Sequence, residues 1–217
     1  KSAFVANGQK CSACGRGVVH QSVVDKLIDS VVAAAQKIFV QGNPSHREVT
    51  LGPVINERAF LNYHQYIKDA HQPGVKITRV NIHHHHSLTL YPGYYVLPVI
   101  IENLPTQHYL LHKELFLPIL RVQSYSGGIE EAVQIANDTE YGLTAGIFTD
   151  DEKEKEYFFK QIMAGVTYAN RKSGATTGAW PTNHAFGGWK NSGWVTQFGV
   201  CGPHYLFNFV RGQTQYD

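Results

Sequence analysis

The stretch YYVLPVII, residues 94–101, decides the fold class of this chain of 217 residues. It is rich in β-branched and aromatic residues, the composition typical of a strand. A second run of this kind, LPILRVQ, occupies residues 117–123. Both runs predict strands, and the surrounding sequence decides how these strands are covered.

Helical spacing appears on the N-terminal side of these strands. Apolar residues from Val23 to Ile38 recur every three or four positions and predict an amphipathic helix over about residues 22–39. The same spacing from Ala59 to Ala70 predicts a second helix. A short strand over residues 75–80 is expected after Gly74.

The C-terminal side continues the alternation of helices and strands. Asp150 or Asp151 is a candidate N-cap for one of its helices. The expected elements are a helix at 130–137, a strand at 146–149, a helix at 152–164, a strand at 166–170, a glycine-rich loop at 173–199 and a closing strand at 205–211. This alternation predicts an α/β fold with an open, mostly parallel sheet flanked by helices, plus a C-terminal strand.

Composition excludes several classes of protein. Hydrophobic residues make up 43% of the chain and charged residues 17%, which is typical of a globular protein. The net charge is +2 without a long basic run, so nucleic acid is not an expected partner. Membrane spans need about 18 consecutive apolar residues, and the sequence has no such run. Three cysteines indicate a reducing compartment, the cytoplasm or, in a eukaryote, the mitochondrial matrix.

The segment GQKCSAC, residues 8–14, carries the first candidate for chemistry. Cys11 follows a glycine turn and adjoins Lys10, a setting in which a thiolate can be exposed and stabilised. Cys11 and Cys14 could instead be half of a zinc site, but the sequence has no second CxxC pair. They could also be a redox pair, which requires a preceding strand and a helix starting at the first cysteine. The segment alone does not decide between these readings.

Four adjacent histidines, His83 to His86, form the one low-complexity tract. Adjacent imidazoles can bind a metal ion weakly. We interpret the tract as a solvated surface loop without function, and we predict no metal site.

Four further motifs follow the cysteine segment in order. They are ELFLPIL (114–120), ANDTEYGLTAGIF (136–148), YANRKSGA (168–175) and AFGGWKNSG (185–193). With GQKCSAC, this ordered set resembles the aldehyde dehydrogenase superfamily over nearly the whole chain. GQKCSAC, ELFLPIL and NRKSGATTGAWP (170–181) resemble most the 1-pyrroline-5-carboxylate dehydrogenase branch, which oxidises glutamate γ-semialdehyde to glutamate with NAD in proline breakdown.

This resemblance implies a mechanism and roles for three residues. The Cys11 thiolate would attack the aldehyde carbon to form a thiohemiacetal, hydride would pass to NAD, and water would hydrolyse the resulting thioester. The backbone amide of Cys11 would donate to the oxyanion. Glu114 would hold the hydroxyls of the nicotinamide ribose, and Phe116 would pack near the nicotinamide. The family's oxyanion asparagine and general-base glutamate lie upstream of the region that this sequence covers.

The resemblance also implies a substrate site. Ser173, Gly174 and Ala175 match the loop that anchors the substrate carboxylate through backbone amides. Ser12 would add a hydroxyl donor, and Phe186 would pack along the aliphatic stem of the semialdehyde.

Two departures from the family pattern support an alternative function. His184-Ala185 replaces the usual Gln-Pro pair, and bulky residues occupy 194–198. These changes would also suit a catalytically inactive homologue that serves as a structural subunit of a larger assembly.

We therefore expect an N-terminally incomplete catalytic domain over residues 1–199, with a tail and oligomerisation strand over 200–217. The chain opens at Lys1 without a methionine, inside an apparent helix, which suggests a fragment. The expected partners are a small aldehyde substrate, a missing cofactor-binding domain and further copies in a homo-oligomer. The fragment alone is expected to be inactive.

Overall fold

The computed structural model describes residues 1–88, 91–171, 184–193 and 202–216. The chain forms two compact units, Lys1–Ala136 and Asn137–Asp217. The grouping of residues 1–199 into one catalytic domain with a separate tail concerns the whole protein and stays a prediction.

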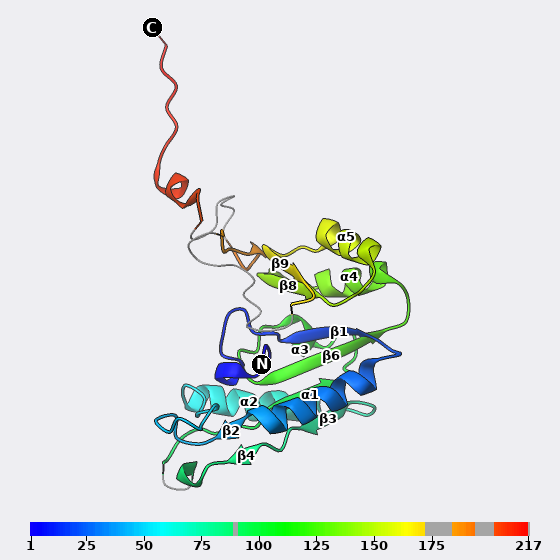
Figure 1. The fold of residues 1–217 in the computed structure, drawn as a ribbon, viewed down its shortest axis with the longest axis vertical. Helices are drawn as coiled ribbons and strands as arrows, with labels where there is room; N and C mark the ends of the chain where they lie inside the picture. Colours follow the sequence, from blue (N-terminus) through cyan, green and yellow to red (C-terminus); the bar gives the residue numbers. More distant parts are fainter. Residues whose placement is uncertain (89–90, 172–183, 194–201, 217) are drawn as a thin grey trace. The chain divides into compact units, whose positions relative to one another are not determined.

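A four-stranded sheet forms the centre of the first unit (Figure 1). Its strand order is β1 (Arg16–His20), β6 (Ile119–Tyr125), β5 (Val99–Glu102) and β3 (Lys76–Arg79). The first three strands are parallel, and β3 runs antiparallel to β5 at the edge. The predicted open, mostly parallel sheet is thereby confirmed.

Three helices accompany this sheet. They are α1 (Val24–Ile38), α2 (Glu57–Ala70) and α3 (Tyr109–His112), with 3-10 turns η1 (Val5–Gly8) and η2 (His86–Leu88). Helix α2 begins where the Asn56 side chain accepts a hydrogen bond of 2.9 Å from the backbone N–H of Ala59. The first two helices were predicted from their spacing, but α3 is a single turn and too short to show a period.

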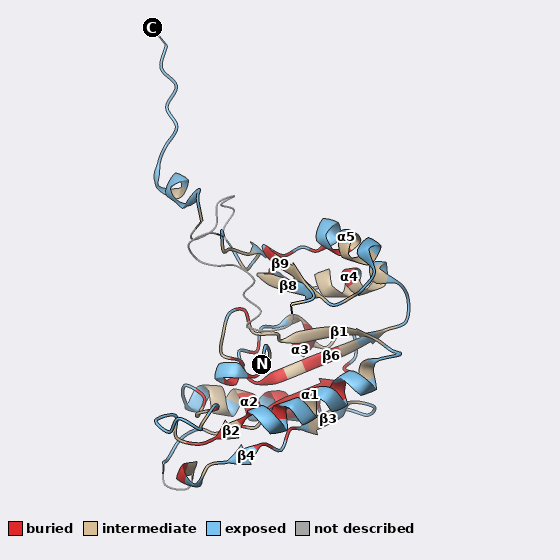
Figure 2. Ribbon diagram, in the orientation of Figure 1, coloured by how far each residue is buried: buried red, intermediate tan, exposed pale blue. Residues whose placement is uncertain are grey.

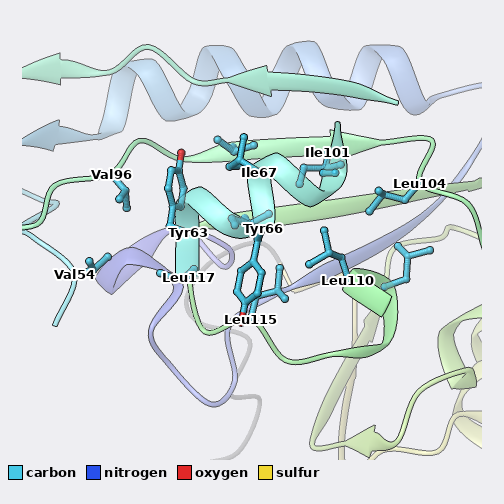
Figure 3. Close-up of a cluster of buried hydrophobic side chains, with 14 residues drawn as sticks. Val54, Tyr63, Tyr66, Ile67, Val96, Ile101, Leu104, Leu110, Leu115 and Leu117 are labelled. Carbon is cyan, nitrogen blue, oxygen red and sulfur yellow. The ribbon is translucent and has the colours of Figure 1, made fainter. Parts of the chain in front are cut away.

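The core lies on both faces of β5 because successive side chains of a strand point in opposite directions. Ile100 packs in a cluster with Ile28 and Ala35 of α1. Val99 and Ile101 pack in a second cluster with α2. Figure 3 shows that second cluster, and Figure 2 shows buried residues in β6 and exposed residues on α1 and α2. The sheet is therefore the middle layer of three.

The second unit is also α/β. Helix α4 (Ile129–Asn137) lies almost wholly before the second unit begins. The unit itself contains α5 (Glu152–Gln161) and four short strands, β7 (Tyr141–Gly142), β8 (Thr144–Ile147), β9 (Val166–Ala169) and β10 (Trp189–Lys190). Strands β8 and β9 are parallel, and β10 pairs antiparallel with β7. The Asp151 side chain accepts a hydrogen bond of 2.7 Å from the Lys153 N–H, which confirms it as the cap of α5.

The predicted closing strand at 205–211 is not a strand in this single chain, and its role as an oligomerisation strand stays a prediction. A 3-10 helix, η3 (Tyr205–Phe209), occupies the segment after Gly202, which has φ +82°. Strand ladders need a neighbour, and no described strand of this chain pairs with the segment. The alternating pattern at residues 205–211 was also weak evidence for a strand, because it would place apolar side chains on both faces of that strand.

Other elements also differ from the prediction. Strand β5 begins at Val99 rather than Tyr94, since Pro98 lacks the N–H that a ladder needs. Strand β1 was not predicted because its sequence, RGVVH, is short and half polar.

In the part of the chain that the structure describes, no helix is long and apolar enough to cross a bilayer.

Truncating Ile100 tests the central role of β5. Ile100→Ala should lower the free energy of unfolding by about 2–5 kcal/mol, because the fully buried side chain leaves a cavity between α1 and the sheet. Ile55→Ala is the matched control, since Ile55 is 79% exposed and should change stability little. Urea unfolding measures both, and equal losses would contradict the layered core.

Candidate active site

A strained turn places the cysteine segment. Ala6, Asn7 and Gly8 all adopt left-handed backbone conformations, with φ of 53°, 55° and 66°. The buried Asn7 side chain donates hydrogen bonds of 2.9 and 3.2 Å to the carbonyl oxygens of Gly52 and Pro53. These bonds hold a conformation that non-glycine residues rarely adopt.

Cys11 lies at the tip of the following turn. The N–H of Ala13 donates to the carbonyl of Lys10 at 3.0 Å, which places Cys11 and Ser12 at the two central turn positions. Cys11 is exposed, whereas Ser12 is only 1% exposed. The thiol of Cys11 therefore faces solvent, and the hydroxyl of Ser12 lies inside the fold.

Cys14 has a different environment from Cys11. Its N–H donates to the carbonyl of Ser2 at 3.0 Å, and its thiol to the carbonyl of Arg16 at 3.5 Å. Burial raises the pKa of the Cys14 thiol, so the unreactive protonated form is favoured. Strand β1, and no helix, follows Cys11, which argues against a redox pair.

A close backbone contact brings two of the sequence motifs together. A Cβ at Gly8 would overlap the carbonyl oxygen of Leu117 and lie 2.7 Å from its carbonyl carbon. Only glycine permits this approach. The strained turn that precedes Cys11 is thus packed against the segment that carries Glu114 and Phe116.

Glu114 and Phe116 project from this segment into solvent. Leu115 and Leu117 are buried in the α2 cluster, at 7% and 5% exposure. The residues between them are exposed, Phe116 at 43%. Phe116 also has φ of 55°, an unusual value for a bulky residue. A carboxylate and an aromatic ring are therefore presented beside the Cys11 turn.

Arg121 is a charged residue behind this site that sequence reasoning missed. It is 5% exposed, its N–H donates to the carbonyl of Gly15 at 3.1 Å, and its Nε has no hydrogen-bond partner. Burial, and then the charge of Arg16, lower its pKa to about 10, while Cys14 and Glu114 oppose this shift. Its charge therefore acts on both motifs. The signal in the sequence was a lone arginine within the apolar run at 117–123.

The second unit packs two other motifs against each other. Gly142 of β7 donates its N–H to the Ser192 Oγ at 3.0 Å. The Lys190 ammonium donates to the carbonyls of Asn137 and Thr139 at 2.6 and 2.9 Å. Segments 136–148 and 185–193 are thereby held together.

The predicted substrate residues divide between described and undescribed parts. Phe186 is half-buried in the second unit. Ser173, Gly174 and Ala175, and the bulky segment 194–198, lie outside the described residues.

Comparisons with known proteins agree with these motifs. The profile of the aldehyde dehydrogenase family matches residues 1–212. The chain is 35% identical, over 98% of its length, to 1-pyrroline-5-carboxylate dehydrogenase 1 of Halalkalibacterium halodurans, of which it covers 39%.

Solved structures give the same result. The chain is similar to a 1-pyrroline-5-carboxylate dehydrogenase from Thermus with bound NAD, at a TM-score of 0.73 and 27% identity, over 87% of this chain and 34% of the other. It is similar to lactaldehyde dehydrogenase from Escherichia coli at a TM-score of 0.81 and 27% identity, over 98% and 42%. The chain spans about two fifths of the curated relative's length.

Substitution of Gly8 tests the contact that joins the cysteine turn to segment 114–117. Gly8→Ala should lower the free energy of unfolding by more than the ~1–2 kcal/mol expected for a left-handed alanine alone, because its Cβ overlaps Leu117. It should also change the rate at which iodoacetamide alkylates Cys11. Gly74→Ala is the control, since Gly74 has φ +85° with open space around its Cβ position. If both variants behave alike, the contact does not constrain the turn.

Proposed function

This chain belongs to the aldehyde dehydrogenase family, and we propose from this premise that the whole protein oxidises glutamate γ-semialdehyde to glutamate with NAD. The resemblance of its motifs to one branch of the family, and its 35% identity to a 1-pyrroline-5-carboxylate dehydrogenase, support this substrate. The rest of the protein would supply the cofactor-binding domain, the general base and the second oxyanion donor.

The observation that carries the proposal is the position of the Cys11 thiol. Cys11 is exposed at the tip of a turn, and the strained turn just before it is packed through Gly8 against Leu117, next to the exposed Phe116. A nucleophile must reach the carbonyl carbon of its substrate, and of the two described cysteines only Cys11 is exposed.

The reaction then follows from the chemistry of a thiolate. A sulfur lone pair of Cys11 forms a bond to the aldehyde carbon, and the carbonyl π electrons move to the oxygen, which the Cys11 amide stabilises. When bound, NAD supplies the acceptor for the two electrons and hydrogen lost in the oxidation. Water then releases the carboxylic acid from the Cys11 thioester and restores the thiol.

Glu114 and Phe116 fit the cofactor role proposed for them. The Glu114 carboxylate is exposed and can accept two hydrogen bonds from a ribose diol. The exposed Phe116 ring offers a flat apolar surface to a nicotinamide ring.

The substrate residues that we propose are those that the family resemblance implies. Backbone amides at Ser173, Gly174 and Ala175 would bind its carboxylate, and Phe186 would pack along its aliphatic stem. Ser12 is the second proposed donor, which requires its buried hydroxyl to turn toward the substrate.

The C-terminal segment supports a proposal of homo-oligomerisation. Leu206, Phe207, Phe209 and Val210 are 57–74% exposed. An apolar group of this kind typically marks a protein contact. We propose that these side chains are buried against another subunit.

Exchange of each cysteine tests the nucleophile. In the full-length protein, Cys11→Ala should abolish aldehyde oxidation, while Cys14→Ala should retain most of it because the Cys14 thiol donates to the Arg16 carbonyl and its raised pKa favours the protonated form. NADH absorbance reports the activity. An equal loss in both variants would favour a redox or metal pair instead.

A substrate panel tests the carboxylate anchor. Glutamate semialdehyde should be preferred over hexanal by roughly 10²–10⁴ in kcat/KM, because hexanal would leave the two proposed carboxylate donors unpaired at about 1–3 kcal/mol each. Succinic semialdehyde completes the panel. Comparable efficiency with hexanal would reject the anchor. Inactivity toward all three, with a free Cys11 thiol, would favour the inactive structural subunit.

A further inference from the structure

The histidine tract is more ordered than the solvated loop expected from the sequence. His83 and His84 form β4, which pairs in parallel with β2 (Val40–Gln41). The next residue, His85, donates its N–H to the carbonyl of Gln41 at 2.8 Å and is only partly exposed. The tract is therefore fastened to the segment that follows α1.

A tight contact fixes the two segments at the position of His85. A Cβ at Gly42 would lie 2.9 Å from the Cβ of His85 and 3.0 Å from the Oγ of Ser87. The Asn43 N–H also donates to that Oγ at 3.1 Å. His85 consequently has a defined position relative to residues 42–49.

Two further donor side chains come from this neighbouring segment. The N–H of His46 donates to the carbonyl of Asn43, and the N–H of Val49 to the carbonyl of His46, both at 3.1 Å. These turns present His46 and Glu48 toward His85, and the rings of His46 and His85 have centroids 4.6 Å apart. One donor atom each of His46, Glu48 and His85 lies within 4.8 Å of the other two.

The donor set matches the preferences of borderline divalent cations. Two imidazoles and one carboxylate are ligands of zinc and similar transition metals. Ligand atoms lie roughly 3.4 Å apart around tetrahedral zinc, so the cluster closes by a movement on the order of 1 Å. His46 and Glu48 are exposed and can make this movement.

Ser87 makes two hydrogen-bonding contacts with the ring of His85. Its Oγ lies 2.8 Å from the Nδ1 of His85. The backbone N–H of Ser87 also donates to this Nδ1 at 3.2 Å, so both contacts hold the orientation of the His85 ring and leave Nε2 outside them. Ser87 itself is 4% exposed, so its hydroxyl is held in place.

From these contacts we propose that His46, Glu48 and His85 bind a divalent transition-metal ion of the zinc type, with Ser87 orienting His85. The site joins residues 42–49 to the histidine tract and is independent of the chemistry at Cys11.

Calorimetric titration of the full-length protein with ZnCl₂ tests this proposal. His46→Ala, His85→Ala and Glu48→Gln should each weaken zinc binding by more than about tenfold, and Ser87→Ala by roughly 10–100-fold. Zinc should also raise the melting temperature of the unsubstituted protein, but not that of His46→Ala.

The control separates a built site from chelation by consecutive histidines. His83 and His84 are exposed members of the tract outside the cluster, so His83→Ala/His84→Ala should keep the zinc affinity. Loss of binding in this double variant but not in His46→Ala would overturn the proposal. Failure of the unsubstituted protein to bind zinc would overturn it equally. Circular dichroism of each variant shows whether it is folded.

Discussion

Burial of β5 on both faces organises the first unit. Ile100 requires an apolar cover on one face and Ile101 on the other, and α1 and α2 supply these covers. At the end of the strand, Glu102 is 5% exposed and pairs with Lys76 at 3.1 Å, so a carboxylate is accommodated at the margin of the apolar layer. Because β6 pairs with both β5 and β1, the layers also fix the segments that enter β1 and β6. Those segments carry the candidate catalytic and cofactor residues.

The candidate active site is positioned by close backbone contacts more than by contacts between side chains. Gly8 and Leu117 meet where a Cβ does not fit, and Asn7 holds the left-handed turn through the carbonyls of Gly52 and Pro53. Within these short segments, neighbouring residues differ in solvent exposure, and their expected roles differ accordingly. Cys11 faces solvent while Ser12 does not, and Phe116 faces solvent between two buried leucines. The buried Arg121 adds a positive charge behind both segments.

The sequence was informative wherever local patterns coincide with packing. The spacing in α1 and α2 and the apolar runs of β5 and β6 reflect burial of one face or of both, and the Asp151 cap is a local hydrogen bond. The closing strand failed because pairing depends on a neighbour, which a local pattern does not contain. Arg121 and Asn7 were missed for a similar reason, since their roles arise from contacts with residues 15 and 52–53. The short ordered motifs identified Cys11, but they could not show that Ser12 is buried.

The packing of glycines in the second unit has a consequence for protein engineering. A Cβ at Gly165 would overlap the carbonyl of Gly187, and one at Gly188 would overlap Ser192. A methyl group is therefore too large at either position, and library design around the half-buried Phe186 has to leave these backbone crossings untouched. Diversity can be introduced instead at exposed positions of the same unit, such as Phe148 and Phe159, where added or removed volume meets solvent.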